Sequence, residues 1–219
     1  MENKNSSAVL TIIAVATLVV AIVGATFAYF QAQGGNAASA NVNVATGTAA
    51  SASLGTFQPI SIYADQTTFG SGKGDATQTT SGTVKWTAPG ATATSTPSVA
   101  DRTFCYTVTF TISNNTFTKS TANTTNLNEL EYTVSKGSTT IINKQTLVNM
   151  STGVGVTGTI NIPTTAGGNV YKHKLTADAG KTVSDTWSIT VTLKNLSVDQ
   201  QQNTGKAFAG VMQFAKTTC

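Results

Sequence analysis

The sequence predicts an all-β protein, an antiparallel β-sandwich of jelly-roll type preceded by one N-terminal hydrophobic helix. Two observations favour it: apolar and polar side chains alternate with a period of two in several segments, and Gly, Asn, Ser and Thr separate these segments. A period of two places successive side chains on opposite faces of a strand, so that one face is buried and the other is wet. No amphipathic helical pattern follows the N-terminal segment, which favours two packed sheets.

The chain of 219 residues opens with a long apolar segment, because residues 8–30 include no charged side chain. A helix of this length would reach about 34 Å, enough to cross a hydrocarbon core about 30 Å thick. The apolar region of a signal peptide is usually shorter, so a retained anchor is one interpretation. Small residues favour cleavage in the region of Ala28, Tyr29 and Phe30. We expect residues 1–29 to be a signal peptide or membrane anchor.

The next segment, residues 30–44, is too poor in apolar side chains to fold alone. Ala, Asn, Gly and Ser dominate it, and Val42 and Val44 are its aliphatic residues beyond alanine. Such a segment can complete the open sheet edge of a neighbouring copy through backbone hydrogen bonds, with the valines as donor-strand side chains in shallow sites. The alternative is a stalk that joins the sandwich to the membrane. The sandwich domain is expected over 45–219.

Within the body, the clearest strand is predicted over 103–112, where aromatic and aliphatic residues alternate with threonines and one cysteine. The same alternation recurs over 130–134, 154–162 and 187–193, and the apolar residues of 208–214 predict a closing strand.

A tract over 69–99, broken by Gly and Pro, predicts long loops around one short strand at 83–87. We expect Phe104, Tyr106, Phe110, Trp187, Ile189 and Val191 to share one core, and Thr107, Thr109, Thr190 and Thr192 to be more exposed.

Cys105 and Cys219 are the two cysteines of the chain, and in an exported protein they predict one disulfide. Cys105 stands on the threonine face of its strand, so the bridge would pin the C-terminal tail across the outer side of a sheet. Closing a loop of this length stabilises a fold by roughly 4 to 5 kcal/mol in the chain-entropy treatment. The alternative is two free thiols or an intermolecular bond.

Residue types that carry catalysis are scarce. His173 is the only histidine, so no zinc site built from several histidines can form. Glu129 and Glu131 stand two apart on one side of a strand, and we interpret them as solvated charges rather than as a glycosidase pair. The aspartates are widely separated along the chain. We expect a protein that is not an enzyme, with no cofactor and no metal site.

The charge pattern excludes a nucleic-acid surface. Charged residues make up 10% of the chain and the net charge is +4, spread along the sequence. A nucleic-acid surface would gather Lys and Arg on one stripe, whereas the nearest cluster is Lys172-His173-Lys174, which we interpret as part of an exposed strand. Uncharged polar residues predominate, as is typical of surface-layer or filament proteins.

Two short stretches carry a resemblance to a known family. Gly24-Ala-Thr-Phe-Ala-Tyr-Phe30, followed by Asn43-Val-Ala-Thr-Gly-Thr48, resembles the start of the TasA/camelysin family. The resemblance implies a SipW-dependent signal peptide, a jelly-roll sandwich, and extracellular biofilm-matrix fibres built by donor-strand exchange. The chain departs from the family pattern at Ala49–Leu54 and at Gln58-Pro59-Ile60.

The leading expectation is therefore an exported structural protein at the cell surface that associates with itself into fibres. The alternative from another class is a monomeric, membrane-anchored binding module with a carbohydrate or host partner. A type IV-like pilin is disfavoured, because no pilin processing site precedes the apolar segment.

Overall fold

The computed structural model describes residues 40–42, 49–69, 72–92 and 95–219, with the backbone alone described for 40–42. The proposed cleavage region at Ala28, Tyr29 and Phe30, the apolar segment 8–30, and Val44 lie outside the described residues. Within the described ranges, no helix combines the length and the apolar character that a membrane crossing needs.

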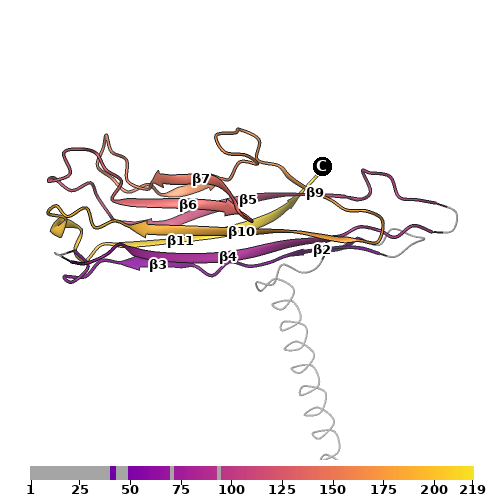
Figure 1. Ribbon diagram of the computed structural model, residues 1–219, viewed down its shortest axis with the longest axis horizontal. Coiled ribbons are helices and arrows are strands. Elements are labelled where there is room, and N and C mark those ends of the chain that lie inside the picture. Colours follow the sequence, from indigo (N-terminus) through magenta and orange to yellow (C-terminus); the bar gives the residue numbers. More distant parts are fainter. Residues whose placement is uncertain (1–39, 43–48, 70–71, 93–94) are drawn as a thin grey trace, which may run out of the picture. The chain divides into compact units, whose positions relative to one another are not determined.

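The first sheet has six antiparallel strands in the order β1-β2-β4-β10-β6-β7. Figure 1 labels these strands except β1. Their bounds are Ala40–Val42 for β1, Ala50–Leu54 for β2, Ala76–Thr87 for β4, Thr182–Leu193 for β10, Leu130–Lys136 for β6 and Thr139–Thr146 for β7. The pair β4 and β10 runs for twelve residues, from Thr87 opposite Thr182 to Ala76 opposite Leu193. This long pair forms the centre of the sheet.

The second sheet has the order β3-β11-β5-β8. Its strands are β3 (Ile60–Tyr63), β11 (Ala207–Thr217), β5 (Thr103–Asn115) and β8 (Gly158–Asn161). A further strand, β9 (His173–Thr176), pairs with the first residues of β5, while β8 pairs with residues nearer its end. Strands β8 and β9 therefore share the side of β5 that β11 does not occupy.

The strands pair as the two arms of one long antiparallel hairpin. Next to its turn β6 pairs with β7, and with increasing distance from the turn β5 pairs with β8 and β9, β4 with β10, and β3 with β11. Because β3 and β5 lie in one sheet and β4 and β6 in the other, the hairpin is rolled into two layers that face each other. The two antiparallel sheets thus form a sandwich, which confirms the predicted all-β class.

The core lies between the two sheets and follows the predicted alternation. The buried residues of this core include Phe104, Tyr106, Phe110, Trp187, Ile189 and Val191. The threonines that alternate with them, Thr107, Thr109, Thr190 and Thr192, are only partly buried. On the outer face, threonines of β4 and β10 pair across the strands, with 2.8 Å between the hydroxyl oxygens of Thr79 and Thr190. The predicted division between core and outer faces is confirmed.

Two strand predictions were wrong in their extent. The strand expected at 83–87 begins seven residues earlier, at Ala76 in β4, because its polar first half pairs with β10 all the way to Leu193. The strand expected over 154–162 is reduced to β8, four residues that start at Gly158. Gly158 has a φ of 102°, which is outside the extended range of a strand.

Candidate functional site

Residues 40–42 of the N-terminal tract form β1, which together with β2 makes one edge of the first sheet. These strands pair antiparallel, with Ala40 opposite Ala52, Asn41 opposite Ser51 and Val42 opposite Ala50. Val42, a predicted donor-strand residue, thus belongs to a strand that pairs within its own chain. We call β1 and β2 the strand-docking edge.

Strand β2 presents a shallow inner face because its sequence alternates small residues. Ala50 and Ala52 are buried, whereas Ser51 and Ser53, which alternate with them, are more exposed. On its other side β2 pairs with the end of β4, from Ser51 opposite Thr87 to Leu54 opposite Val84. The strand is therefore held to the sheet from one side and accepts β1 on the other.

A cavity of about 290 Å³ lies beside Ala50 and Ala52. Trp86 and Phe104 contribute stacked rings to its lining, with 5.4 Å between their centroids. The indole nitrogen of Trp86 is satisfied because it donates to the carbonyl oxygen of Arg102 at 2.8 Å. The strand-docking edge therefore has unfilled, largely apolar space behind its small side chains.

The predicted disulfide lines the same cavity. Cys105 and Cys219 are bonded, with 5.2 Å between their Cα atoms, and both contribute to the lining. Thr217, the last residue of β11, lies opposite Cys105 in β5, so the bridge ties the C-terminal tail to the neighbouring strand. The intramolecular bond is confirmed, and the C-terminal tail is held next to the strand-docking edge.

The opposite edge of the first sheet, at β7, is irregular. The pairing of β6 with β7 shifts register twice, between Tyr132 and Val134 and between Val134 and Ser135. Lys144 in β7 has a φ of 46°, in the left-handed region that residues with side chains seldom adopt. Bulges and bends of this kind protect an edge against the addition of another strand. The edge at β7 is therefore a poor acceptor for a donor strand.

Glu129 is fully buried, which corrects its interpretation as a solvated charge. One carboxylate oxygen accepts hydrogen bonds from the backbone N–H of Ser120 and from the amide of Asn123, at 2.6 and 3.0 Å. The other accepts from three side chains, at distances of 2.7 to 3.3 Å. These three donors are Ser120 Oγ, Gln200 Nε2 and Asn203 Nδ2. Five neutral donors thus take the place of solvent around the charge.

Glu131 is also buried, with 8% of its surface exposed, so its interpretation as a solvated charge is wrong too. The amide of Asn128 donates to its carboxylate at 3.3 Å.

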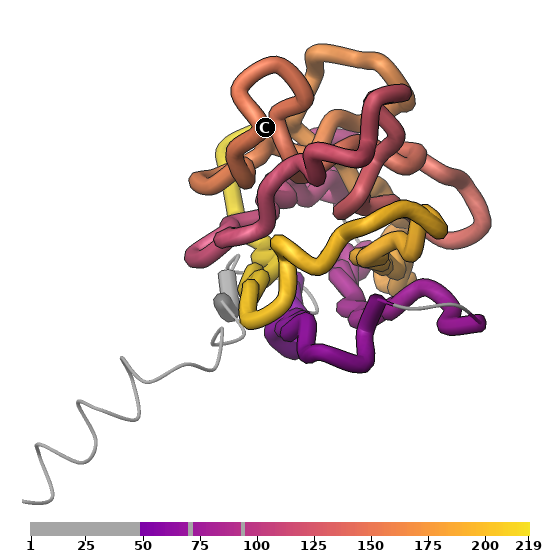
Figure 2. The backbone as a smooth tube through the Cα atoms, turned by 90° about the vertical axis from the view of Figure 1, so that its left-hand side faces the viewer, coloured from indigo at the N-terminus to yellow at the C-terminus, as the bar shows by residue number. Residues whose placement is uncertain are grey.

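Glu129 joins two loops at one end of the sandwich, because its donors come from both of them. Figure 2 views this end, where the gold connection between β10 and β11 crosses beside the β5–β6 loop. The arrangement of Glu129 and its donors therefore holds the two loops together and has a structural role.

His173, on β9, is buried between two aromatic rings rather than exposed. Its Nε2 lies 3.0 Å from the carbonyl oxygen of Ile162, and its ring contacts Tyr106 and Trp187. Burial lowers the pKa of the His173 imidazole below its usual value, which favours the neutral ring. Lys172 and Lys174 on either side are exposed, as predicted.

Next to this ring, the hydroxyl of Tyr106 donates to a carboxylate oxygen of Asp185 at 2.5 Å and accepts from the indole N–H of Trp187 at 3.0 Å. Burial, followed by the hydrogen bond to Asp185, raises the pKa of Tyr106. Lys136 completes the cluster with an ion pair to Asp185 at 2.7 Å. Each polar group has a partner, so the cluster satisfies buried polarity in the way that structural networks do.

Across the described part of the chain, no group of three or more His, Cys, Asp or Glu side chains is arranged to hold a metal ion. No protein-family model, curated protein or solved structure matches this chain.

Proposed function

We propose that this protein is an exported structural subunit that assembles into extracellular fibres by exchanging its N-terminal strand between copies. The observation that carries the proposal is the strand-docking edge, where an N-terminal strand of three residues, β1, is held on β2 by backbone pairing. An edge that accepts a strand from its own chain also accepts the same strand from a second copy, because the hydrogen bonds are identical.

The composition of the tract suits this exchange. Residues 31–44 consist largely of Ala, Asn and Gly, and β-strand addition draws its affinity from the main chain, so a tract without large side chains can still bind. The small residues of β2 and the cavity beside them leave room for side chains of the added strand. When each copy donates to the next, the contact is head-to-tail and generates an open filament.

The fold class and the resemblance support the same function. The nested strand order, with β3-β11-β5-β8 in one layer and β4-β10-β6-β7 in the other, supports assignment to the jelly-roll class. This class is the one implied by the resemblance of residues 24–30 and 43–48 to the TasA/camelysin family of biofilm-matrix fibre proteins. The Cys105–Cys219 bridge is consistent with an oxidising extracellular compartment, which the apolar segment 8–30 would allow the chain to reach.

A pair of introduced cysteines tests the exchange directly. Asn41→Cys with Ser51→Cys places two thiols at opposed positions of β1 and β2, where the Cα separation of paired strands permits a disulfide. If β1 is exchanged, oxidation of assembled protein joins neighbouring subunits, and a non-reducing gel shows a ladder of covalent oligomers that collapses on reduction.

The matched controls are the unsubstituted chain, whose own bridge is intramolecular, and the single variant Asn41→Cys. Both should run as monomers or at most dimers. A double variant that is cross-linked only within monomers, in a sample that contains fibres, contradicts the exchange.

A further inference from the structure

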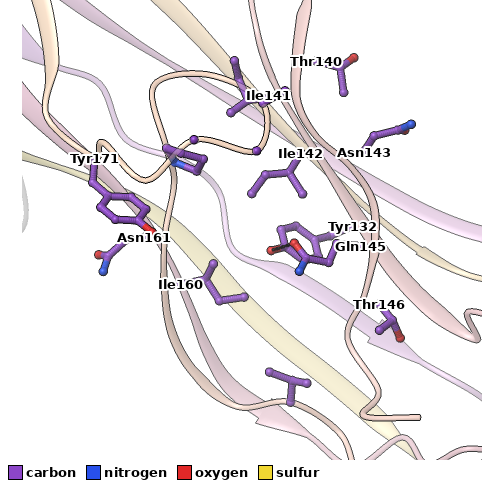
Figure 3. A pocket seen from close by; sticks show the side chains of 15 residues that line it. Tyr132, Thr140, Ile141, Ile142, Asn143, Gln145, Thr146, Ile160, Asn161 and Tyr171 are labelled. Carbon is purple, nitrogen blue, oxygen red and sulfur yellow. Dashed lines mark hydrogen bonds between the residues drawn. The ribbon is translucent and has the colours of Figure 1, made fainter.

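A large cavity lies away from the strand-docking edge, between β7 and β8 (Figure 3). It measures about 990 Å³ and is also bounded by the loop that follows β8. Asn161 and Tyr171 lie along one wall, and Tyr132, Ile142 and Gln145 along the other, with Ile160 between them. We call this space the β7–β8 groove.

The groove is uncharged. None of the fifteen described residues that line it is Asp, Glu, Lys, Arg or His. A surface cavity of this size without a charged side chain in its lining favours a neutral ligand. A charged ligand would lose its hydration there without gaining an opposite charge.

Several polar groups in the groove are available to a ligand. Within the described residues, the side-chain amide of Asn161 and the hydroxyl of Tyr171 make no hydrogen bond to the protein. Gln145 accepts one hydrogen bond, at 3.2 Å from the hydroxyl of Tyr132. Amide groups both donate and accept, so Asn161 and Gln145 can each bind a ligand hydroxyl in either role.

The apolar surfaces of the groove lie next to these polar groups. Tyr171 is 42% exposed, and Ile142 and Ile160 are only partly buried. An exposed tyrosine offers a flat apolar ring together with a polar tip. Pockets that combine such surfaces with a few fixed polar groups, in the size range of this groove, are typical small-molecule sites.

A peptide strand fits the groove less well than a compact ligand. Strand addition needs a continuous row of backbone groups, but the edge at β7 is interrupted by register shifts and by Lys144. Strand β8 offers only four residues. The available hydrogen-bonding groups are therefore mainly side chains.

We propose that the β7–β8 groove binds a neutral oligosaccharide of a few sugar units. Sugar rings carry hydroxyls that both donate and accept hydrogen bonds, which matches Asn161 and Gln145, and apolar C–H faces, which match the ring of Tyr171 and the two isoleucines. The proposal does not depend on strand exchange, because that process uses the edge at β1 and β2.

The test is titration of the purified full chain with four neutral hexasaccharides, built from glucose in β-1,4 linkage, glucose in α-1,4 linkage, mannose and N-acetylglucosamine. Binding is followed by calorimetry and by amide chemical shifts. We expect at least one of them to bind with shifts centred on β7, β8 and residues 161–171. Tyr171→Ala and, separately, Asn161→Ala should each weaken binding about tenfold.

The control variant is Tyr63→Ala, since Tyr63 on β3 is 64% exposed and does not line the groove. It should bind within twofold of the unsubstituted chain, and hexagalacturonate, an anionic hexasaccharide, should not bind. The proposal is overturned if none of the four neutral sugars binds at millimolar concentration, if Tyr63→Ala weakens binding as much as Tyr171→Ala, or if a peptide of residues 31–44 shifts the same amides.

Discussion

At the scale of single residues, Glu129 links two loops at one end of the sandwich. A buried carboxylate is costly unless its oxygens are fully hydrogen-bonded. Here Ser120 and Asn123 approach from the β5–β6 loop, and Gln200 and Asn203 from the β10–β11 connection. The charge therefore holds together two loops that have no strand pairing to join them at this point.

We expect Glu129→Gln to lower the free energy of unfolding by roughly 2 to 3 kcal/mol. The substituted amide keeps the size of the side chain but points a donor at groups that are themselves donors, among them the amides of Gln200 and Asn203. Urea denaturation measures the loss. The matched control is Glu131→Gln, because Glu131 accepts one side-chain hydrogen bond in the described residues and its loss should stay below about 1 kcal/mol. Equal losses of unfolding free energy in both variants would show that the hydrogen bonds around Glu129 contribute no more to stability than the one made by Glu131.

His173 predicts a dependence of stability on pH with a defined sign. Burial lowers its pKa in the folded state, and the groups that face it are Tyr106, Trp187, Lys136 and Asp185. Well above a pH of about 6.5 the ring is neutral in both states. As the pH falls from there towards the lowered folded pKa, the unfolded chain takes up a proton that the folded protein does not, and stability declines.

We expect the free energy of unfolding to fall by at most about 1.4 kcal/mol per pH unit between pH 6.5 and the folded pKa of His173. Chemical denaturation at pH 7.5, 6.5 and 5.5 measures this change. His173→Gln removes the only histidine of the chain. The unfolding free energy of this variant should therefore change less with pH over the same interval. The same slope in both proteins would mean that another group is responsible.

At the scale of elements, β1 differs from the other strands because it is short and lies at the end of the sheet order. Three residues of backbone pairing contribute little net stability once the entropy of ordering them is subtracted. A weakly held terminal strand can leave its own sheet and pair with another copy at small cost.

We expect deletion of residues 30–41 to abolish fibres while it lowers the free energy of unfolding by about 1 kcal/mol or less. The deletion removes Ala40 and Asn41, two of the three residues of β1, and leaves the pairing of β2 with β4 intact. Sedimentation and electron microscopy measure assembly, and urea denaturation measures the stability of the remaining sandwich. Unchanged self-association would contradict exchange of β1 as the basis of assembly.

At the scale of the whole sandwich, the two proposed functions use opposite edges of one sheet. The order β1-β2-β4-β10-β6-β7 places the strand-docking edge at one end and the wall of the β7–β8 groove at the other. Strand exchange at β2 therefore leaves the groove open, and a fibre would present one groove per subunit. Failure of one proposal does not imply failure of the other.

The sequence by itself determined the features that depend on local pattern or on counting. The alternation over 103–112 and 187–193 identified which faces of β5 and β10 are buried, because strand geometry sends successive side chains to opposite sides. The disulfide followed from there being two cysteines, Cys105 and Cys219. The all-β class required nothing beyond these local patterns and the scarcity of helical ones.

Only the tertiary structure decided the rest, because it depends on contacts between residues that are far apart in the chain. Glu129 was predicted to be solvated, yet it is buried by Gln200 and Asn203, which lie 71 and 74 residues away. The polar first half of β4 became strand because β10, more than a hundred residues later, supplies its backbone partners. The β7–β8 groove likewise exists only where two sheet edges meet. Local periodicity reports which face of a strand is apolar, but it carries no information about which distant segment will cover a charge, pair with a strand or form the opposite wall of a groove.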